Sequence, residues 1–153
     1  MSIEDNLKDL KIELPEPKAP VGAYVATKIT GKLLFISGQV SIDKNNNLIK
    51  GKVGKDLNLD QGYAAAERCG LSLIAHVKKA CDGDLEKIKS CIKLTGYVNS
   101  TDTFLDQPKV INGASEIITK IFEDKGFHTR AAVSSNSLPL GVAVEVDAIF
   151  EIN

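Results

Sequence analysis

The chain contains 153 residues, of which 43% are hydrophobic and 25% are charged, and its formal net charge is −1. A chain of this size and composition can form one globular domain with its own core. It has no tryptophan, 5% aromatic residues and no lysine run longer than two, so it lacks the basic, aromatic-rich surface typical of a nucleic-acid-binding protein.

The N-terminus and the cysteines indicate a reducing compartment. The first ten residues are acidic and contain no apolar segment, which argues against a secretory signal, and no apolar run in the chain approaches the length of a membrane span. Cys69, Cys81 and Cys91 are odd in number and form no C-x-x-C pair, which argues against both a disulfide framework and a zinc site. We therefore expect a cytoplasmic protein with reduced, mostly buried thiols, no metal and no membrane association.

Residues 1–19 are predicted to form a short helix and a proline-rich lead-in to one domain at residues 20–153. Ser2 and Asp5 approximate a capping box for a helix over residues 2–10. Three of the five prolines lie in the stretch 15–20 that follows this helix, and they favour an extended connector.

The domain is predicted to begin with a β-hairpin. Residues 24–29 and 32–37 have the pattern of two strands around a glycine turn. Gly38 follows directly and indicates either a β-bulge, which is the simpler interpretation, or a close approach of another group to the backbone. Residues 47–53 are predicted to add a short edge strand.

Two amphipathic helices are predicted over residues 58–81 and 106–125, because each range carries one apolar stripe at helical spacing. Asn58 and Gln61 form a capping-box pattern at the start of the first helix. Asp106 is expected to cap the second.

Residues 85–98, 130–135 and 142–150 are predicted to contain the remaining strands. Apolar and polar residues alternate strictly along the last of these, as in a half-buried strand. The last two ranges are joined by a turn rich in Asn, Ser, Pro and Gly, so we expect them to pair as a hairpin. In such a hairpin Arg130 and Glu145 could face one cleft.

This order of elements predicts an α+β domain in which two helices lie on one face of a mixed sheet. The other face is predicted to carry Phe35, Cys91, Tyr97 and Ile149. These side chains are too apolar to be left in water, so we infer that an oligomer covers them.

The sequence lacks the usual motifs for cofactor, nucleotide or metal chemistry. GxGxxG, GxxxxGK[ST], HExxH and GxSxG are all absent. His76 is interpreted as a boundary residue of the first long helix. His128 is a candidate cleft residue, because it would share a strand face with Arg130 if the strand extended that far, but the simpler interpretation is a solvated loop residue.

The remaining candidates are Arg130, Glu145, Tyr24 and the corner formed by Ser37 and Gly38. The planar guanidinium of arginine matches a carboxylate with two hydrogen bonds, which suits a site for small carboxylic acids. From periodicity alone, the simpler interpretation of Arg130 and Glu145 is a surface ion pair that contributes little to stability.

Five stretches together resemble one known family. They are P-x-G-x-Y at residues 20–24, LLFISGQV at 33–40, the region around Asn112, TRAAV at 129–133 and LPLGVAVEVDAIFE at 138–151. From about Pro20 onward, nearly the whole chain resembles the Rid family of reactive-intermediate (enamine/imine) deaminases, also called the YjgF-type or L-PSP endoribonuclease family.

The resemblance implies a chorismate-mutase-like fold that assembles as a homotrimer with clefts between subunits, and it implies no cofactor. It implies that Arg130 binds the carboxylate of a 2-imino acid or its enamine. It also implies that Glu145 positions the water that adds to the C=N bond, so that ammonia and a 2-oxo acid are released. The matching cleft-lining positions are Tyr24, Ser37, Gly38 and Asn112.

Three departures from the family pattern indicate a divergent subgroup. Ala132 stands where well-known members often have a cysteine, Ser115 stands where they have an aromatic residue, and the chain up to about Pro15 lies outside the common core. Two other functions therefore stay open. One is an endoribonuclease or translation inhibitor, against which the near-neutral charge argues; the other is a non-catalytic trimer that binds small carboxylates or partner proteins.

Overall fold

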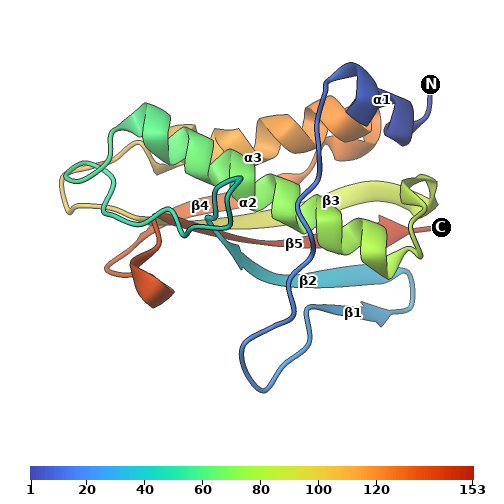
Figure 1. Cartoon of the computed structure of the whole chain (residues 1–153), viewed down its shortest axis with the longest axis horizontal. Coiled ribbons are helices and arrows are strands. Elements are labelled where there is room, and N and C mark those ends of the chain that lie inside the picture. Colours follow the sequence, from blue (N-terminus) through green and yellow to red (C-terminus); the bar gives the residue numbers. More distant parts are fainter.

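The computed structural model describes residues 1–153, which form a five-stranded sheet with helices covering one face (Figure 1). The helices are α1 (Ile3–Asp9), α2 (Leu59–Ala80) and α3 (Gln107–Phe122). The strands are β1 (Thr27–Thr30), β2 (Leu33–Val40), β3 (Ile88–Asn99), β4 (Thr129–Ser135) and β5 (Val144–Ile152). Short 3-10 turns lie at Leu85–Lys87, Glu123–Gly126 and Pro139–Gly141.

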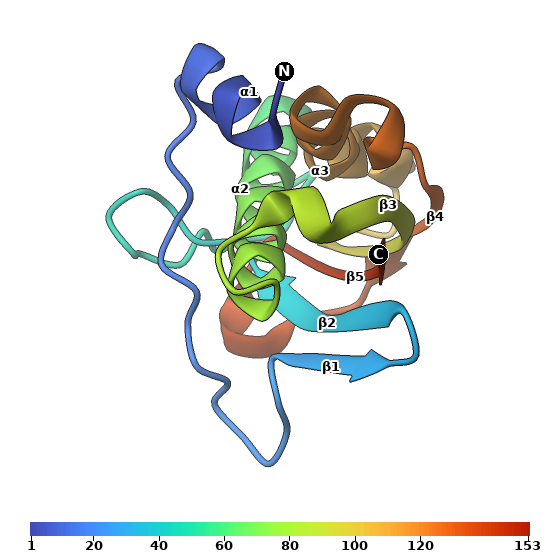
Figure 2. The same cartoon turned by 90° about the vertical axis from the view of Figure 1, so that its right-hand side faces the viewer.

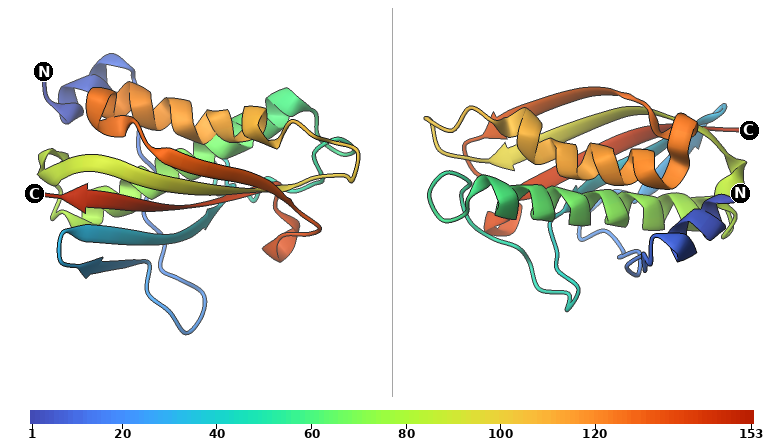
Figure 3. Two further views of the ribbon diagram at one scale, coloured as in Figure 1. Left: turned by 180° about the vertical axis from the view of Figure 1, so that it is seen from behind. Right: turned by 90° about the horizontal axis from the view of Figure 1, so that it is seen from above.

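The strand order is β1-β2-β5-β3-β4, and only the β3–β4 pair is parallel. Figure 3 shows α2 and α3 lying side by side across one face of this sheet. The predicted mixed α+β sheet with two helices on one face is therefore confirmed.

The predicted hairpin of β4 with β5 is wrong, because β3 lies between these two strands. The chain leaves β3, crosses over through α3 and returns as β4 parallel to β3, which is how a strand–helix–strand unit places its second strand. β5 then enters the middle of the sheet and pairs with β2 and β3.

The ends of the helices follow the sequence closely. Both predicted capping boxes are present, at Ser2 with Asp5 and at Asn58 with Gln61. Asp106 lies at the predicted cap of α3, but its side chain accepts no capping hydrogen bond. In addition, α3 ends at Phe122 rather than near residue 125, because the next residue adopts a left-handed conformation and a 3-10 turn follows.

The edge strand predicted over residues 47–53 is absent. Only isolated bridges form there: Leu48 with Ile42, Lys50 with Val142, and Val53 with both Leu57 and Ser100. Gly51, at φ +122°, breaks the extended run, since this conformation lies outside the strand region.

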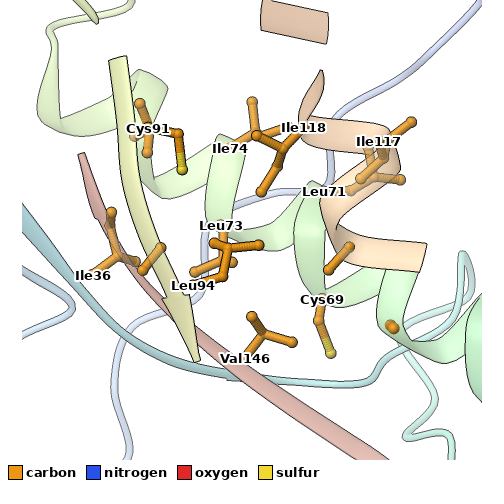
Figure 4. Close-up of a cluster of buried hydrophobic side chains, with 14 of the residues drawn as sticks. Ile36, Cys69, Leu71, Leu73, Ile74, Cys91, Leu94, Ile117, Ile118 and Val146 are labelled. Atoms are coloured by element: carbon orange, nitrogen blue, oxygen red, sulfur yellow. The ribbon is translucent and has the colours of Figure 1, made fainter. Parts of the chain in front are cut away.

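The core lies between the sheet and the two long helices. Figure 4 shows Leu73 and Ile74 of α2 and Ile118 of α3 facing Leu94 of β3 and Val146 of β5. All three cysteines are buried free thiols, as predicted.

The opposite face of the sheet carries three of the four predicted apolar residues. Phe35 is 40% exposed there, and Tyr97 and Ile149 are partly buried. Cys91 is the exception and lies in the core, because a bulge between Cys91 and Lys93 shifts the alternation of β3 by one residue.

The N-terminal segment crosses the helical layer. Figure 2 shows α1 beside the ends of α2 and α3, with the connector running past α2 toward β1. Ile3 and Leu7 are buried in the core, and the Asn6 amide donates to the carbonyl of Ile121 over 3.1 Å. None of the helices is both long enough and apolar enough to cross a membrane.

Candidate functional site

Glu145 lies on β5, and its side chain points to the face of the sheet away from the helices, beside a bulge in β2. The register of β2 against β5 shifts between Ile36 and Gln39, so the predicted bulge is confirmed. A Cβ atom at Gly38 would overlap the Glu145 carboxylate. Gly38 was expected to mark either a β-bulge or a close approach of another group to the backbone. Both are present, since the backbone at the bulge contacts the side chain of Glu145.

A cavity of about 500 Å³ begins at this carboxylate. Tyr24, Ser37 and Gly38 border it together with Glu145, so the structure groups four of the six predicted site residues. The Ser37 hydroxyl donates to the carbonyl of Val25 over 2.7 Å and so holds the segment that carries Tyr24.

Two carboxylates share the outer face of β5. Burial, followed by the charge of Asp147, raises the pKa of Glu145 above its usual value. Burial also raises the pKa of Asp147, which lies 3.5 Å from the hydroxyl of Tyr97. Glu145 is therefore more readily protonated than an exposed glutamate, which suits a group that accepts and returns a proton.

Arg130 lies on β4 and turns toward α3. Its Nη1 donates to Oδ1 of Asn112 over 2.7 Å and to Oγ of Ser115 over 3.2 Å. The structure thus groups the other two predicted site residues with each other, and adds Ser115, which was noted in the sequence only as a departure from the family pattern.

His128 extends this network and is not a solvated loop residue. Its Nδ1 lies 2.6 Å from the carbonyl of Gly126, and its Nε2 lies 2.9 Å from Oγ of Ser115. A carbonyl can only accept, so Nδ1 carries the proton and Nε2 accepts from Ser115. Burial and the nearby charge of Arg130 lower the pKa of His128 and favour this neutral form. Ser115 keeps a lone pair directed at Arg130 as a result.

Arg130 and Glu145 do not meet within one chain. Arg130 is the cross-strand neighbour of Leu94, which faces the helices, whereas Glu145 is the neighbour of Tyr97, which faces away from them. They form no ion pair, and neither the cavity at Glu145 nor the hollow at Arg130 is bordered by both. The prediction of a shared cleft in one hairpin is therefore wrong, and so is the surface ion pair.

Sequence reasoning missed His76 and Ser72, which lie one turn apart on α2 and border the cavity that starts at Glu145. His76 is only 4% exposed, so it is not the boundary residue expected from its place beside the apolar stripe. Its spacing of four from Ser72 was the available signal, because it puts both polar groups on one helix face.

The chain does not bring three His, Cys, Asp or Glu side chains together in a way that could hold a metal ion. The side chains around Glu145 form one half-site and those around Arg130 form the other. Together they offer a guanidinium, a carboxylate, hydroxyls, an amide and imidazoles. Such groups can bind a small carboxylic acid and transfer protons.

This sheet and helix arrangement is a chorismate-mutase-like α+β fold, and comparisons with known proteins agree. A family model described as "YjgF/chorismate_mutase-like, putative endoribonuclease" matches residues 4–151. The chain therefore belongs to the YjgF/chorismate-mutase-like family, the Rid family that the sequence resembles.

Relatives match over nearly the full length of the chain. Protein TCP17 of Trypanosoma cruzi is 40% identical over 149 residues, which cover 97% of this chain and 92% of that protein. The crystal structure of Atu1372 from Agrobacterium tumefaciens is 42% identical with a TM-score of 0.90, covering 99% of this chain and 94% of that one. The crystal structure of a Shewanella oneidensis protein described as a "putative endoribonuclease" is 33% identical with a TM-score of 0.95. The match covers 99% of this chain and 100% of that one. The N-terminal segment thus lies within the aligned region of both structures.

Proposed function

We propose that this protein hydrolyses 2-imino acids, or their enamine tautomers, to 2-oxo acids and ammonia without a cofactor. The reaction would take place in clefts between the subunits of a homotrimer, where Arg130 of one chain meets Glu145 of its neighbour. The observation that carries this proposal is the division of the site: each chain holds a cation half and a carboxylate half on opposite faces of its sheet.

The exposed sheet face supports assembly. Phe35 and Ile149 lie beside each other on this face, as cross-strand partners of β2 and β5. Partly exposed apolar side chains on the same sheet face as Glu145 favour a subunit interface there. A neighbour docked on this face would bring its own groups to the carboxylate.

Arg130 is suited to bind the substrate carboxylate. Asn112 and Ser115 accept hydrogen bonds from Nη1, which fixes the plane of the guanidinium and leaves its other N–H groups for a ligand. Such positioning makes the attack of water on the bound imine effectively unimolecular.

Glu145 would act as the proton-transfer group. Its carboxylate takes a proton from water as the water oxygen bonds to the C=N carbon, and passes this proton to the imine nitrogen. The hydroxyl of the resulting carbinolamine then gives its proton to the carboxylate, which passes it to the amine. The C–N bond breaks with its electron pair leaving on ammonia, and the former hydroxyl oxygen becomes the oxo group of the 2-oxo acid.

Release of ammonia and 2-oxo acid from freshly generated 2-iminobutyrate tests the proposal. The wild type is expected to exceed the spontaneous rate, and Arg130→Ala to fall back to it. Arg130→Lys serves as the matched control, since it keeps the charge but loses the planar fork, and it should restore only part of the activity. No acceleration by the wild type with several imines would contradict the proposal and favour a non-catalytic carboxylate-binding trimer.

The family description also names an endoribonuclease, which is the second candidate function. An RNA-cleaving activity that follows the folded protein through purification and is retained by Arg130→Ala would favour the endoribonuclease function. The formal charge of −1 offers little electrostatic attraction for a phosphate backbone, so we place imine hydrolysis first.

A further inference from the structure

The cavity at Glu145 extends well beyond the predicted catalytic groups. One wall is the N-terminal connector, with Pro15, Pro17 and Val21. Ile42 and Leu48 border it as well. At about 500 Å³, it falls in the range of sites that enclose whole small molecules, and it is far larger than a three-carbon acid requires.

The connector is a fixed wall rather than a loose tail. α1 anchors its start, because Glu4 pairs with Lys78 of α2 at 2.8 Å and two apolar side chains of α1 are part of the core. Ile12 and Leu14 pack against that core, and alternating prolines then stiffen the chain where it borders the cavity. An apolar group beside this wall would gain dispersion contacts without having to order the segment first.

His76 supplies a buried polar group to this cavity, whose lining also includes Gln39 and the exposed Glu16 and Lys18. The histidine is only 4% exposed, it borders the cavity, and neither ring nitrogen forms a hydrogen bond within the chain. Ser72, one turn earlier on α2, borders the cavity too and has no side-chain hydrogen bond. Their polar atoms are unpaired but not sealed in the core, so both are available to a hydrogen-bonding group of a ligand in the cavity.

We propose that this cavity is the side-chain pocket of the imine hydrolase, and that it selects 2-imino acids with a long, unbranched apolar side chain ending in a neutral hydrogen-bonding group. The reacting carbon would lie at Glu145, the apolar chain along the proline connector, and the terminal group at Ser72 and His76. This inference rests on the proposed function and adds the substrate class to it.

The terminal group is taken as neutral for an electrostatic reason. Burial and the charge of Lys79 lower the pKa of His76, so its imidazole is uncharged near neutral pH. A neutral imidazole can donate to or accept from a hydroxyl or an amide, but it offers no opposite charge to a carboxylate or an ammonium group.

The first experiment compares kcat/KM for three imines generated in place by an amino acid oxidase from alanine, norleucine and 6-hydroxynorleucine. Norleucine-derived imine should exceed the alanine-derived one by roughly tenfold or more, since three further methylenes are buried. The terminal hydroxyl should add about three- to tenfold. His76→Leu should abolish only this second gain. Ser72→Leu, which puts a larger side chain on the cavity lining, should lower the long-to-short ratio, whereas Ala64→Leu on the exposed side of the same helix should not.

Binding of stable acids separates this inference from the proposed function. Calorimetry with propionate, hexanoate and 6-hydroxyhexanoate should give the same order of affinity, and His76→Leu should remove the advantage of the hydroxyl. If no imine is hydrolysed but this order appears, the enzymatic proposal fails and the cavity assignment stands. Equal kcat/KM for all three imines, or equal affinity for the three acids, would overturn the cavity assignment.

Discussion

Gly38 and Glu145 are packed so closely that any side chain at position 38 would take the space of the Glu145 carboxylate. This contact lies at the bulge in β2, where the register against β5 shifts between Ile36 and Gln39. The pair links a local irregularity of one strand to the position of a group on another.

Gly38→Ala is therefore expected to lower kcat/KM by roughly tenfold or more, because the carboxylate must move away from its place. Imine hydrolysis and thermal unfolding of the same preparation measure the two effects. Gly31→Ala is the matched control: position 31 has open space but φ +57°, so that change should cost stability and leave kcat/KM nearly unaltered. A Gly38→Ala protein with full activity would show that Glu145 need not occupy this position.

The pH dependence of hydrolysis should report Glu145. Its pKa is raised by burial and by Asp147, and the ionised form is the proton acceptor, so kcat/KM should fall with decreasing pH at a point above the ordinary value of 4.5. Asp147→Asn removes the neighbouring charge and should move this limb to lower pH. If the acidic limb of the kcat/KM profile does not move in Asp147→Asn, the limb reports a group other than Glu145.

Stability should respond to pH at the same residue. A raised pKa in the folded state means that ionising Glu145 costs stability as pH rises through its folded pKa. Glu145→Gln should therefore unfold at a higher temperature than the wild type at pH 7, and the difference should shrink below pH 4.5. Equal melting temperatures throughout would indicate that the carboxylate carries no folding penalty.

Asn112 should control how Arg130 binds an acid. Asn112→Ala removes the 2.7 Å hydrogen bond and should raise KM several-fold with a smaller change in kcat. Asn112→Asp should raise KM more, since a carboxylate at this position occupies the guanidinium that the substrate needs. Steady-state kinetics of both variants checks the order, and a smaller effect for Asp than for Ala would contradict it.

The contact between the two long helices depends on Gly113. A Cβ atom there would overlap the backbone carbonyl of Tyr63, which cannot move aside, so Gly113→Ala should lower the free energy of unfolding by about 3 kcal/mol. At Gly62 the nearest atoms are side-chain methyls of Val110, at 3.2 and 3.3 Å, and Gly62→Ala should cost less. Urea denaturation of both variants measures the difference, and equal losses would contradict it.

Local patterns predicted the local structure well. Capping boxes, apolar stripes and strand alternation depend on residues close in the chain, so α1, α2 and β5 could be located from the sequence. Pairing between β4 and β5 could not be predicted from proximity in sequence, because β3 enters between them from more than thirty residues upstream. A single bulge likewise reversed the side on which Cys91 lies.

The candidate site was predictable only in part. Resemblance to the family selected Tyr24, Ser37, Gly38 and Glu145, which the structure brings to one cavity, and Arg130 with Asn112, which are hydrogen-bonded. Their roles stay predictions. Ser72 and His76 escaped notice as cavity residues, because a histidine beside an apolar helix stripe has the same pattern whether it lies at a boundary or lines a cavity.

The most direct test of a site shared between subunits is co-expression of Arg130→Ala with Glu145→Gln, each inactive alone. In randomly mixed trimers about one quarter of the clefts would combine an intact Arg130 with an intact Glu145, so the mixture should regain about one quarter of wild-type activity. Mixed oligomers that form but stay inactive, beside an active wild type, would contradict a cleft built from two chains.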